Sequence, residues 1–238
     1  MASSTFDHAG NISQVTNWTI EAFRLAQSGA QAAAQAVATD SEEAVKALRS
    51  CEVSLDRIDH DVDEFSTSVI THVSESDARE LLASMKLLVN LERIGDLLLS
   101  FGNRVESVGP RLEADDKKAL ESMAIRLESM LGDADSAYRE RNLDRAVTVL
   151  RADAEMDRLR NLIFLHHLEG HREVRHPESF HVLFMAQGLE RAGDHVKNIA
   201  EEVCHLVSGR TVRHVLRSYD VPDEKLFIEH LRAQQREK

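Results

Sequence analysis

The chain has 238 residues, of which 29 are Lys or Arg and 41 are Asp or Glu, so its formal net charge is −12. A chain this acidic is poorly suited to bind nucleic acid or an anionic membrane through bulk charge. The sequence contains only 3 Pro and 10 Gly, while 42% of its residues are hydrophobic. Because Pro and Gly punctuate turns and loops, this composition predicts an all-α protein of long helices around a substantial core.

The chain carries no recognisable targeting signal or membrane anchor. Its first ten residues are polar, unlike a secretory signal. The longest uncharged stretch, residues 25–39, is rich in Ala and Gln and falls short of the ~20 apolar residues that cross a bilayer. Cys51 and Cys204 are too few and too far apart for a disulfide framework. We therefore expect a cytoplasmic protein with free thiols and no transmembrane segment.

Apolar residues recur at three- and four-residue steps along most of the chain, which is typical of amphipathic helices. The first three predicted helices span residues 12–38, residues 42–72, and the segment from just after Ser74 to residue 108. Three more are predicted at residues 114–141, 143–167 and 177–208, and a short terminal helix at 224–235. Ser41 is a suitable N-cap, and the Gly109-Pro110 pair and Gly209 are suitable helix ends.

The sequence contains an internal repeat. Leu91-Glu92-Arg93-Ile94-Gly95-Asp96 recurs as Leu189-Glu190-Arg191-Ala192-Gly193-Asp194, an offset of 98 residues with five of six positions identical. Glu52-x-x-x-Asp56 is matched by Asp153-x-x-x-Asp157 at an offset of 101. Two matches at nearly one period indicate a duplicated unit. We therefore predict two tandem three-helix bundles, at residues 10–109 and 110–217, followed by a C-terminal tail at 218–238.

The repeated strings place acidic residues four positions apart, so that both carboxylates of a pair stand on one face of a helix. Antiparallel packing of neighbouring helices would bring two pairs together, and clustered carboxylates are how proteins hold hard cations. A solvated acidic face, partly neutralised by Arg93 or Arg191, is the simpler alternative. Gly95 and Gly193 stand in helix interiors, where Gly costs about 1 kcal/mol relative to Ala. Their recurrence suggests close approach of a neighbouring helix or a ligand.

The longer string at residues 189–203, LERAGDHVKNIAEEV, and the following GRTVRH at 209–214 resemble the signature of the PhoU phosphate-regulatory proteins. The resemblance covers roughly residues 12–216 and is stronger in the second half. It implies a six-helix, two-repeat cytoplasmic protein that binds multinuclear metal clusters, often iron or zinc. It also implies a homodimeric negative regulator of the phosphate regulon that works with the phosphate ABC transporter and its sensor histidine kinase.

The resemblance assigns metal-ligand roles to eight carboxylates. It makes Glu52, Asp56, Glu92 and Asp96 the ligands of a first site and Asp153, Asp157, Glu190 and Asp194 the ligands of a second. The first half departs from the family pattern, because Ser100 stands where the second half has Asn198, and Gly102 replaces the usual Ala. The first cluster is therefore expected to be weaker or differently occupied. Arg160 replaces the acidic extension that Asp59 provides, so the sites need not hold equal numbers of metals.

The 12 histidines raise two further hypotheses, a di-iron site and a histidine-rich connection between helices. Glu178-x-x-His181 and Glu202-x-x-His205 match the ligand pairs of ferritin-like di-iron bundles, but they lie 24 residues apart on one predicted helix. That separation is about 36 Å, and a di-iron site needs two facing helices. The histidines around the connection between the fifth and sixth helices are interpreted as a solvated polar segment: His166, His167, His171, His176 and His181.

The sequence supports no enzymatic activity, because it contains no nucleophile elbow, P-loop or dinucleotide-binding string. Its basic residues are dispersed and only 5% of residues are aromatic, which argues against nucleic acid as a partner. Two alternatives to a metal-binding regulator stay open. One is a metal-dependent hydrolase that uses the same carboxylate faces, and the other is a purely structural bundle without metal. The apolar residues near 226–231 are expected to pack on the bundle or to dock a partner.

Overall fold

The computed structural model describes residues 8–169 and 178–209. This part of the chain forms six long α-helices and contains no strand. The helices are α1 (His8–Thr39), α2 (Glu42–Val69), α3 (Glu75–Val108), α4 (Ala114–Glu140), α5 (Leu143–Glu169) and α6 (Ser179–Ser208), and a 3-10 turn, η1 (Gly109–Arg111), follows α3. The predicted all-α fold of six long helices is confirmed.

Side-chain caps explain why several helices begin where they do. The Ser41 hydroxyl accepts a hydrogen bond from the backbone N–H of Ala44 at the start of α2, and the Ser74 hydroxyl accepts one from Asp77 at the start of α3. Each bond satisfies an N–H that has no partner inside the helix. Gly209 ends α6 with φ of 74°, a left-handed conformation that favours glycine.

Some predicted boundaries differ from the structure. α1 begins at His8, four residues before the predicted start, and α2 ends at Val69 instead of residue 72. The backbone N–H of His72 donates to the Val69 carbonyl at 2.8 Å, so the last turn tightens and leaves the α-helical pattern. The predicted helix start at Pro177 and the predicted tail helix at 224–235 lie outside the described residues.

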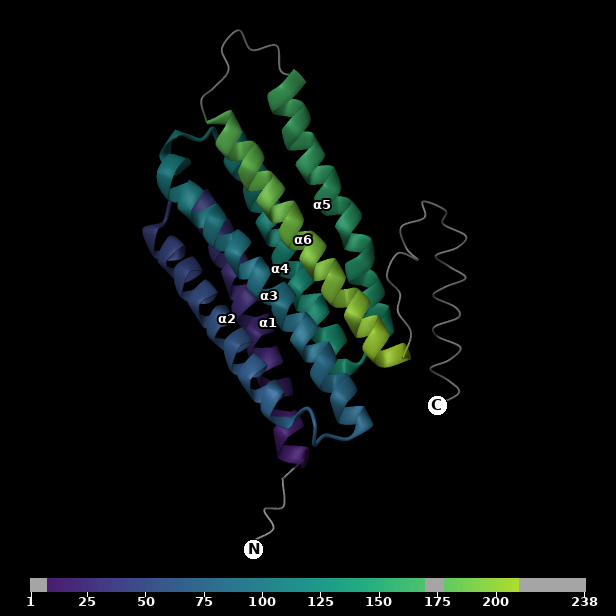
Figure 1. Cartoon of the computed structure of the whole chain (residues 1–238). Helices are drawn as coiled ribbons and strands as arrows, with labels where there is room; N and C mark the ends of the chain where they lie inside the picture. The colour runs from purple at the N-terminus through teal and green to yellow at the C-terminus, as the bar shows by residue number, and fades with distance from the viewer. Residues whose placement is uncertain (1–7, 170–177, 210–238) are drawn as a thin grey trace, which may run out of the picture.

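The six helices pack as two three-helix halves, α1–α3 and α4–α6 (Figure 1). α1 packs against α4 and α3 packs against α6, so these four helices join the halves. α2 packs mainly against α1 and α3, and α5 mainly against α4 and α6, which places α2 and α5 at opposite sides of the bundle (Figure 1). One continuous hydrophobic core runs through both halves.

A polar contact is built into the core where the halves meet. Tyr138 of α4 is fully buried with its ring 5.9 Å from that of Phe23 on α1. Its hydroxyl donates to Glu80 Oε1 on α3 at 2.9 Å, and the Arg141 guanidinium also reaches Glu80 at 2.6 Å. Because buried polar groups are costly without partners, this network fixes α3 and α4 in one relative position.

Both cysteines, Cys51 and Cys204, are free thiols, as the sequence predicted, and both are buried. Burial raises the pKa of Cys51 to about 11 and that of Cys204 to about 12. Thiols with such high pKa values are poor nucleophiles at neutral pH. Among the described helices, none has a stretch that is long and apolar enough to span a bilayer.

His167, near the connection between α5 and α6, is not solvated. The interpretation of this histidine-rich region as a solvated polar segment is wrong for His167. Its side chain is almost fully buried, with Nε2 2.9 Å from Asp116 Oδ1 and Nδ1 3.1 Å from the Ser179 hydroxyl. These bonds tie the end of α5 to the starts of α4 and α6. Periodicity did not reveal this role, because His167 lies at the end of its helix. His166 is exposed, as expected, and residues 171 and 176 lie outside the described part.

Candidate functional site

The first predicted carboxylate cluster lies between α2 and α3. Burial raises the pKa of Glu52, and the nearby charges of Asp56 and Asp96 raise it further. Burial also raises the pKa of Glu92, where Asp96, Asp56 and Asp59 add repulsion and Arg93 partly offsets it. Because each of these shifts involves carboxylates from both helices, the structure brings the four predicted residues of the first half into one electrostatic cluster.

Gly95 lies where α2 and α3 approach closely beside this cluster. A Cβ at position 95 would stand 2.8 Å from Cδ1 of Leu55 and 3.6 Å from the Cα of Glu52. The close approach that was predicted from the mid-helix glycine is therefore present. It places the carboxylate pair of α2 beside that of α3.

The second predicted cluster lies between α5 and α6. Burial raises the pKa of Glu190, with added repulsion from Asp194 and Asp157 and an opposing effect of Arg160. Burial raises the pKa of Asp194 as well, and Asp153 and Asp157 add to the shift. The four predicted carboxylates of the second half therefore also face one another.

Gly193 has the same place in the second half as Gly95 has in the first. A Cβ at position 193 would stand 3.3 Å from Cγ of Met156, which is tighter than an ordinary van der Waals contact. The neighbour here is a flexible methionine, so α5 and α6 are less closely constrained at this level than α2 and α3.

Basic side chains neutralise the two clusters to different degrees. In the first, Arg93 forms ion pairs with Glu92 at 3.4 Å and with Asp96 at 3.2 Å. In the second, Arg160 Nη2 lies 3.5 Å from both Asp157 and Glu190. Lys197 pairs with Asp153 there. The second cluster thus has two cations for four carboxylates.

The first cluster is the more negative of the two. Asp59 extends it on α2, and burial together with Asp63 and Asp56 raises the pKa of Asp59. Its carboxylates share one guanidinium, that of Arg93. On charge alone, a cation is attracted more strongly to the first cluster. That this cluster is weaker or differently occupied stays a prediction.

The sequence pattern predicts the acidic residues but not all of their partners. Arg160 and Lys197, and not the predicted Arg191, form the ion pairs of the second cluster. Lys197 lies three residues after Asp194 and therefore on a neighbouring part of the same helix face. This spacing alone indicates a basic residue beside the second cluster. Gln187 lies three residues before Glu190 and donates a hydrogen bond to its carboxylate.

The donor set suits a hard cation in chemical type. Oxygen ligands are preferred by Mg²⁺, Ca²⁺ and Mn²⁺, whereas zinc favours sites that include nitrogen or sulfur. In the described part of the chain, however, no three His, Cys, Asp or Glu side chains stand in an arrangement that could hold one ion. The carboxylates are turned instead toward Arg93, Arg160 and Lys197. A cation would have to compete with these side chains.

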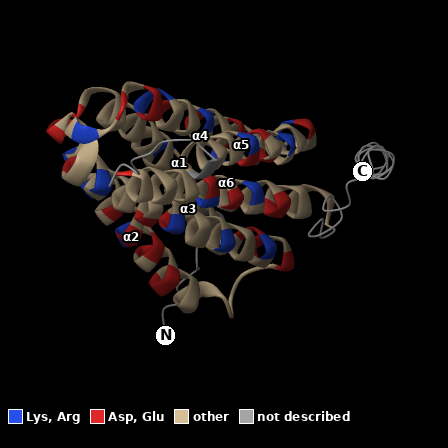
Figure 2. Cartoon of the chain, turned by 90° about the horizontal axis from the view of Figure 1, so that it is seen from above, with Lys and Arg blue, Asp and Glu red and all other residues tan. Residues whose placement is uncertain are grey.

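The charged surface outside the clusters is mixed. Over the described helices, Figure 2 shows Lys and Arg interspersed with Asp and Glu, as the dispersed sequence pattern predicted. His181 and His205 both belong to α6, so the two Glu-x-x-His strings do not face each other across two helices as a di-iron site requires. Glu202 forms an ion pair with Lys86 of α3 at 3.0 Å.

Fold and site together define a helical-bundle protein made of two related three-helix halves, each with an acidic cluster between its last two helices. A family model of the PhoU domain matches the chain at residues 19–105 and 120–203, which is more than half of its length. The chain belongs to the PhoU family.

Several named relatives are similar to the chain. The phosphate-specific transport system accessory protein PhoU homolog of Caulobacter vibrioides is 34% identical over 152 residues, covering 61% of this chain and 64% of that protein. The homolog of Clostridium acetobutylicum is 31% identical over 140 residues, covering 57% and 63%. The chain therefore spans less than two thirds of the length of these relatives. PhoU of Serratia marcescens is 28% identical over 182 residues, covering 74% of each chain.

Solved structures have the same fold. The crystal structure of PhoU from Pseudomonas aeruginosa aligns with a TM-score of 0.75 and 20% identity, covering 86% of this chain and all of that one. The phosphate transport system regulatory protein PhoU from Streptococcus pneumoniae aligns with a TM-score of 0.75 and 19% identity, covering 87% and 99%. The relatives are named as accessory or regulatory proteins of a transport system and not as enzymes, which agrees with the sequence prediction.

Proposed function

We propose that this protein is an accessory regulator of phosphate-specific transport. It inhibits phosphate uptake and represses the phosphate regulon when phosphate is abundant. The observation that carries the proposal is the match of both halves to the PhoU domain, together with the names of the similar proteins. In this proposal it acts in the cytoplasm as a homodimer. Its partners are the cytoplasmic side of the phosphate ABC transporter and the sensor histidine kinase.

Deletion and restoration of the gene in its native host tests this role. Phosphate-starvation genes should be derepressed in phosphate-rich medium when the gene is deleted, and repressed again when it is restored. The control is a strain that carries the empty vector. Unchanged repression in a strain with no second copy of the gene would contradict the proposed function.

The proposal includes divalent cations at both carboxylate clusters. Two observations support bound cations. Glu52 lies on a helix that faces the helix of Glu92 and Asp96, and repulsion between carboxylates contributes to the raised pKa values of Glu52 and Glu92. A bound cation would relieve that repulsion. When bound, the ions would neutralise the acidic faces and hold α2 against α3 and α5 against α6. The resemblance favours iron or zinc, while the oxygen-only donor set favours manganese or magnesium.

Metal analysis separates these choices. Protein dialysed against each cation in turn should retain metal, and Asp96→Asn combined with Asp194→Asn should lower the retained amount. Glu64→Gln is a control, because Glu64 is an exposed residue of α2 outside both clusters. Equal metal content in the double variant and the control would show that these carboxylates are not the ligands.

A metal-dependent hydrolase on the same faces is the alternative from another class. No contact in the described structure favours it, and the similar proteins are named as transport accessory proteins. Turnover of a phosphate ester by purified protein that is lost with Asp194→Ala would support it.

A further inference from the structure

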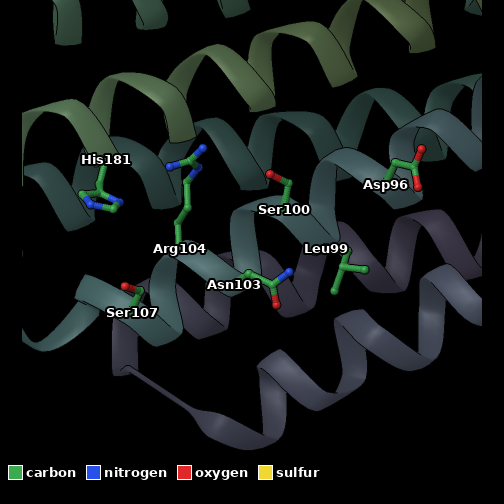
Figure 3. Close-up of a pocket in the computed structure, with 7 residues that line it drawn as sticks. All are labelled: Asp96, Leu99, Ser100, Asn103, Arg104, Ser107 and His181. Carbon is green, nitrogen blue, oxygen red and sulfur yellow. The ribbon is translucent and has the colours of Figure 1, made fainter.

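A polar groove lies beside the first carboxylate cluster, between the second half of α3 and the start of α6. Its volume is about 430 Å³. The polar residues that line it are Ser100, Asn103, Arg104 and Ser107 of α3 and His181 of α6, and Asp96 stands at one end. Figure 3 shows Arg104 and Ser100 extending from α3 toward α6, with the His181 ring reaching in from α6.

Arg104 brings to this groove a positive charge that no carboxylate in the described part of the chain neutralises. Its guanidinium carbon lies 4.8 Å from the centre of the Phe184 ring, and within the described residues it forms no ion pair. Contact with an aromatic face orients a guanidinium without cancelling its charge. The planar fork of an arginine suits the oxygens of phosphate.

Two neighbours of Arg104 in the groove, Asn103 and His181, carry N–H groups. Arg49 Nη2 donates to Asn103 Oδ1 at 3.4 Å, and since a guanidinium can only donate, the Asn103 amide must turn its NH₂ group elsewhere. His181 Nδ1 is buried and has no hydrogen-bond partner among the described residues. The Asn103 NH₂ group, the His181 ring through Nε2, and the hydroxyls of Ser100 and Ser107 can donate to a bound oxyanion.

The repeat provides an internal comparison. At the 98-residue offset, Arg104 corresponds to Glu202, and Phe184 corresponds to Lys86. At the repeat-related contact between the same two helices, buried Glu202 of α6 pairs with Lys86 of α3 at 3.0 Å, with buried Glu201 beside it. Arg104 of α3 instead lies on the Phe184 ring of α6 and has no ion pair among the described residues. The positive groove is therefore present at one of the two repeat-related contacts between α3 and α6 and does not follow from the duplicated fold.

The one carboxylate that lines the groove does not cancel this charge. Asp96 stands eight residues before Arg104 on α3, about 12 Å along the helix axis. This separation exceeds the Debye length of ~8 Å at physiological ionic strength. Asp96 is also paired with Arg93 at 3.2 Å, so an anion beside Arg104 meets little repulsion from it.

We propose that this groove binds inorganic phosphate, with Arg104 as the charged anchor and Asn103, His181 and the two serine hydroxyls as further donors. The choice of phosphate among oxyanions rests on the proposed function. The site itself rests on the groove and does not require a cation at the carboxylate clusters. With one guanidinium and an open groove, we expect a dissociation constant on the order of 1 mM.

Calorimetric titration of the full chain with inorganic phosphate tests the proposal, after chelation of metal and at an ionic strength held constant with chloride. The wild type should bind saturably, and Arg104→Gln should weaken binding at least about tenfold. Arg79→Gln should bind like the wild type, because Arg79 pairs with Glu75 on the exposed start of α3. Ser100→Asp, which adds a negative charge to the groove, should also weaken binding.

Three results would overturn the inference. The first is no saturable binding by the wild type at roughly ten times the expected dissociation constant. The second is equal binding by the folded Arg104→Gln and Arg79→Gln variants. The third is binding of glycerol phosphate without binding of the free ion. If deletion of the gene derepresses phosphate-starvation genes while the protein binds no phosphate, only this inference fails. If Arg104-dependent binding is found and deletion changes nothing, only the proposed function fails.

Discussion

Replacement of Glu52 by Gln should stabilise the metal-free protein. Burial raises the pKa of Glu52, and so do the charges of Asp56 on the same helix and Asp96 on the facing helix, with no opposing partner. A like-charge pair of this kind costs about 0.2–0.5 kcal/mol, so relief from two neighbours should raise the free energy of unfolding by about 0.5–1 kcal/mol. Gln keeps nearly the same size and can still form hydrogen bonds.

The pH dependence of this effect has a defined sign. The pKa of Glu52 in the folded protein lies above the ordinary glutamate value of 4.5, so the folded protein holds this proton more tightly than the unfolded chain. The contribution of Glu52 to stability is therefore full below pH 4.5 and is lost as the pH rises through the folded pKa. Glu52→Gln should match the wild type near pH 4 and exceed it at pH 7.

Thermal unfolding in chelator and low salt measures the difference, which should be an increase in Tm of about 1–4 °C at pH 7. Glu64→Gln on the same helix should stay within about 0.5 kcal/mol of the wild type. Divalent cation should then stabilise the wild type more than Glu52→Gln, because it binds the folded state of the intact cluster. A lower Tm for Glu52→Gln at pH 7 would refute the claim that the cluster stores repulsion.

Three further predictions concern packing and ion pairs. Arg160→Gln should lower the free energy of unfolding of metal-free protein by about 1–2 kcal/mol in urea titrations. The reason is that Asp157 and Glu190 both lose their half-buried cationic partner. Unchanged stability would show that Arg160 does not stabilise the second cluster. Gly95→Val should lower the free energy of unfolding by about 1–3 kcal/mol, because the new Cβ would stand 2.8 Å from Leu55. Gly188→Ala should raise it by up to about 1 kcal/mol, because nothing lies within 4 Å of a Cβ there. Changes of the same sign for both variants would contradict the packing argument. His167→Ala should cost about 2 kcal/mol by chemical denaturation through loss of two buried hydrogen bonds, and an effect below about 0.5 kcal/mol would show that the link is not structural.

The sequence predicted the helices well because their signals are local. Apolar periodicity located all six, and Ser41 and Gly209 marked boundaries through caps that depend on a few neighbouring residues. The end of α2 was misplaced by three residues, because the tightened turn at His72 leaves no mark in the apolar pattern. The buried position of His167 was missed for a related reason, since its partners lie on α4 and α6.

The carboxylate clusters were predictable because repeated i, i+4 spacing places pairs on one helix face, and antiparallel neighbours then face one another. The choice of Arg160 and Lys197 as partners, in place of Arg191, depends on the rotation of α5 against α6. The groove at Arg104 likewise depends on which α6 residue meets α3. Such contacts across helices are set by packing of the whole core, which one sequence does not specify.

Complementation by an altered protein tests the link between the clusters and regulation most directly. The measurement is the level of phosphate-starvation transcripts in phosphate-rich medium, in a deletion strain that produces Asp96→Asn combined with Asp194→Asn at wild-type abundance. These transcripts should stay derepressed, as in the deletion strain, while Glu64→Gln should restore repression. Full repression by the double variant would show that the carboxylate clusters are not required for the proposed function.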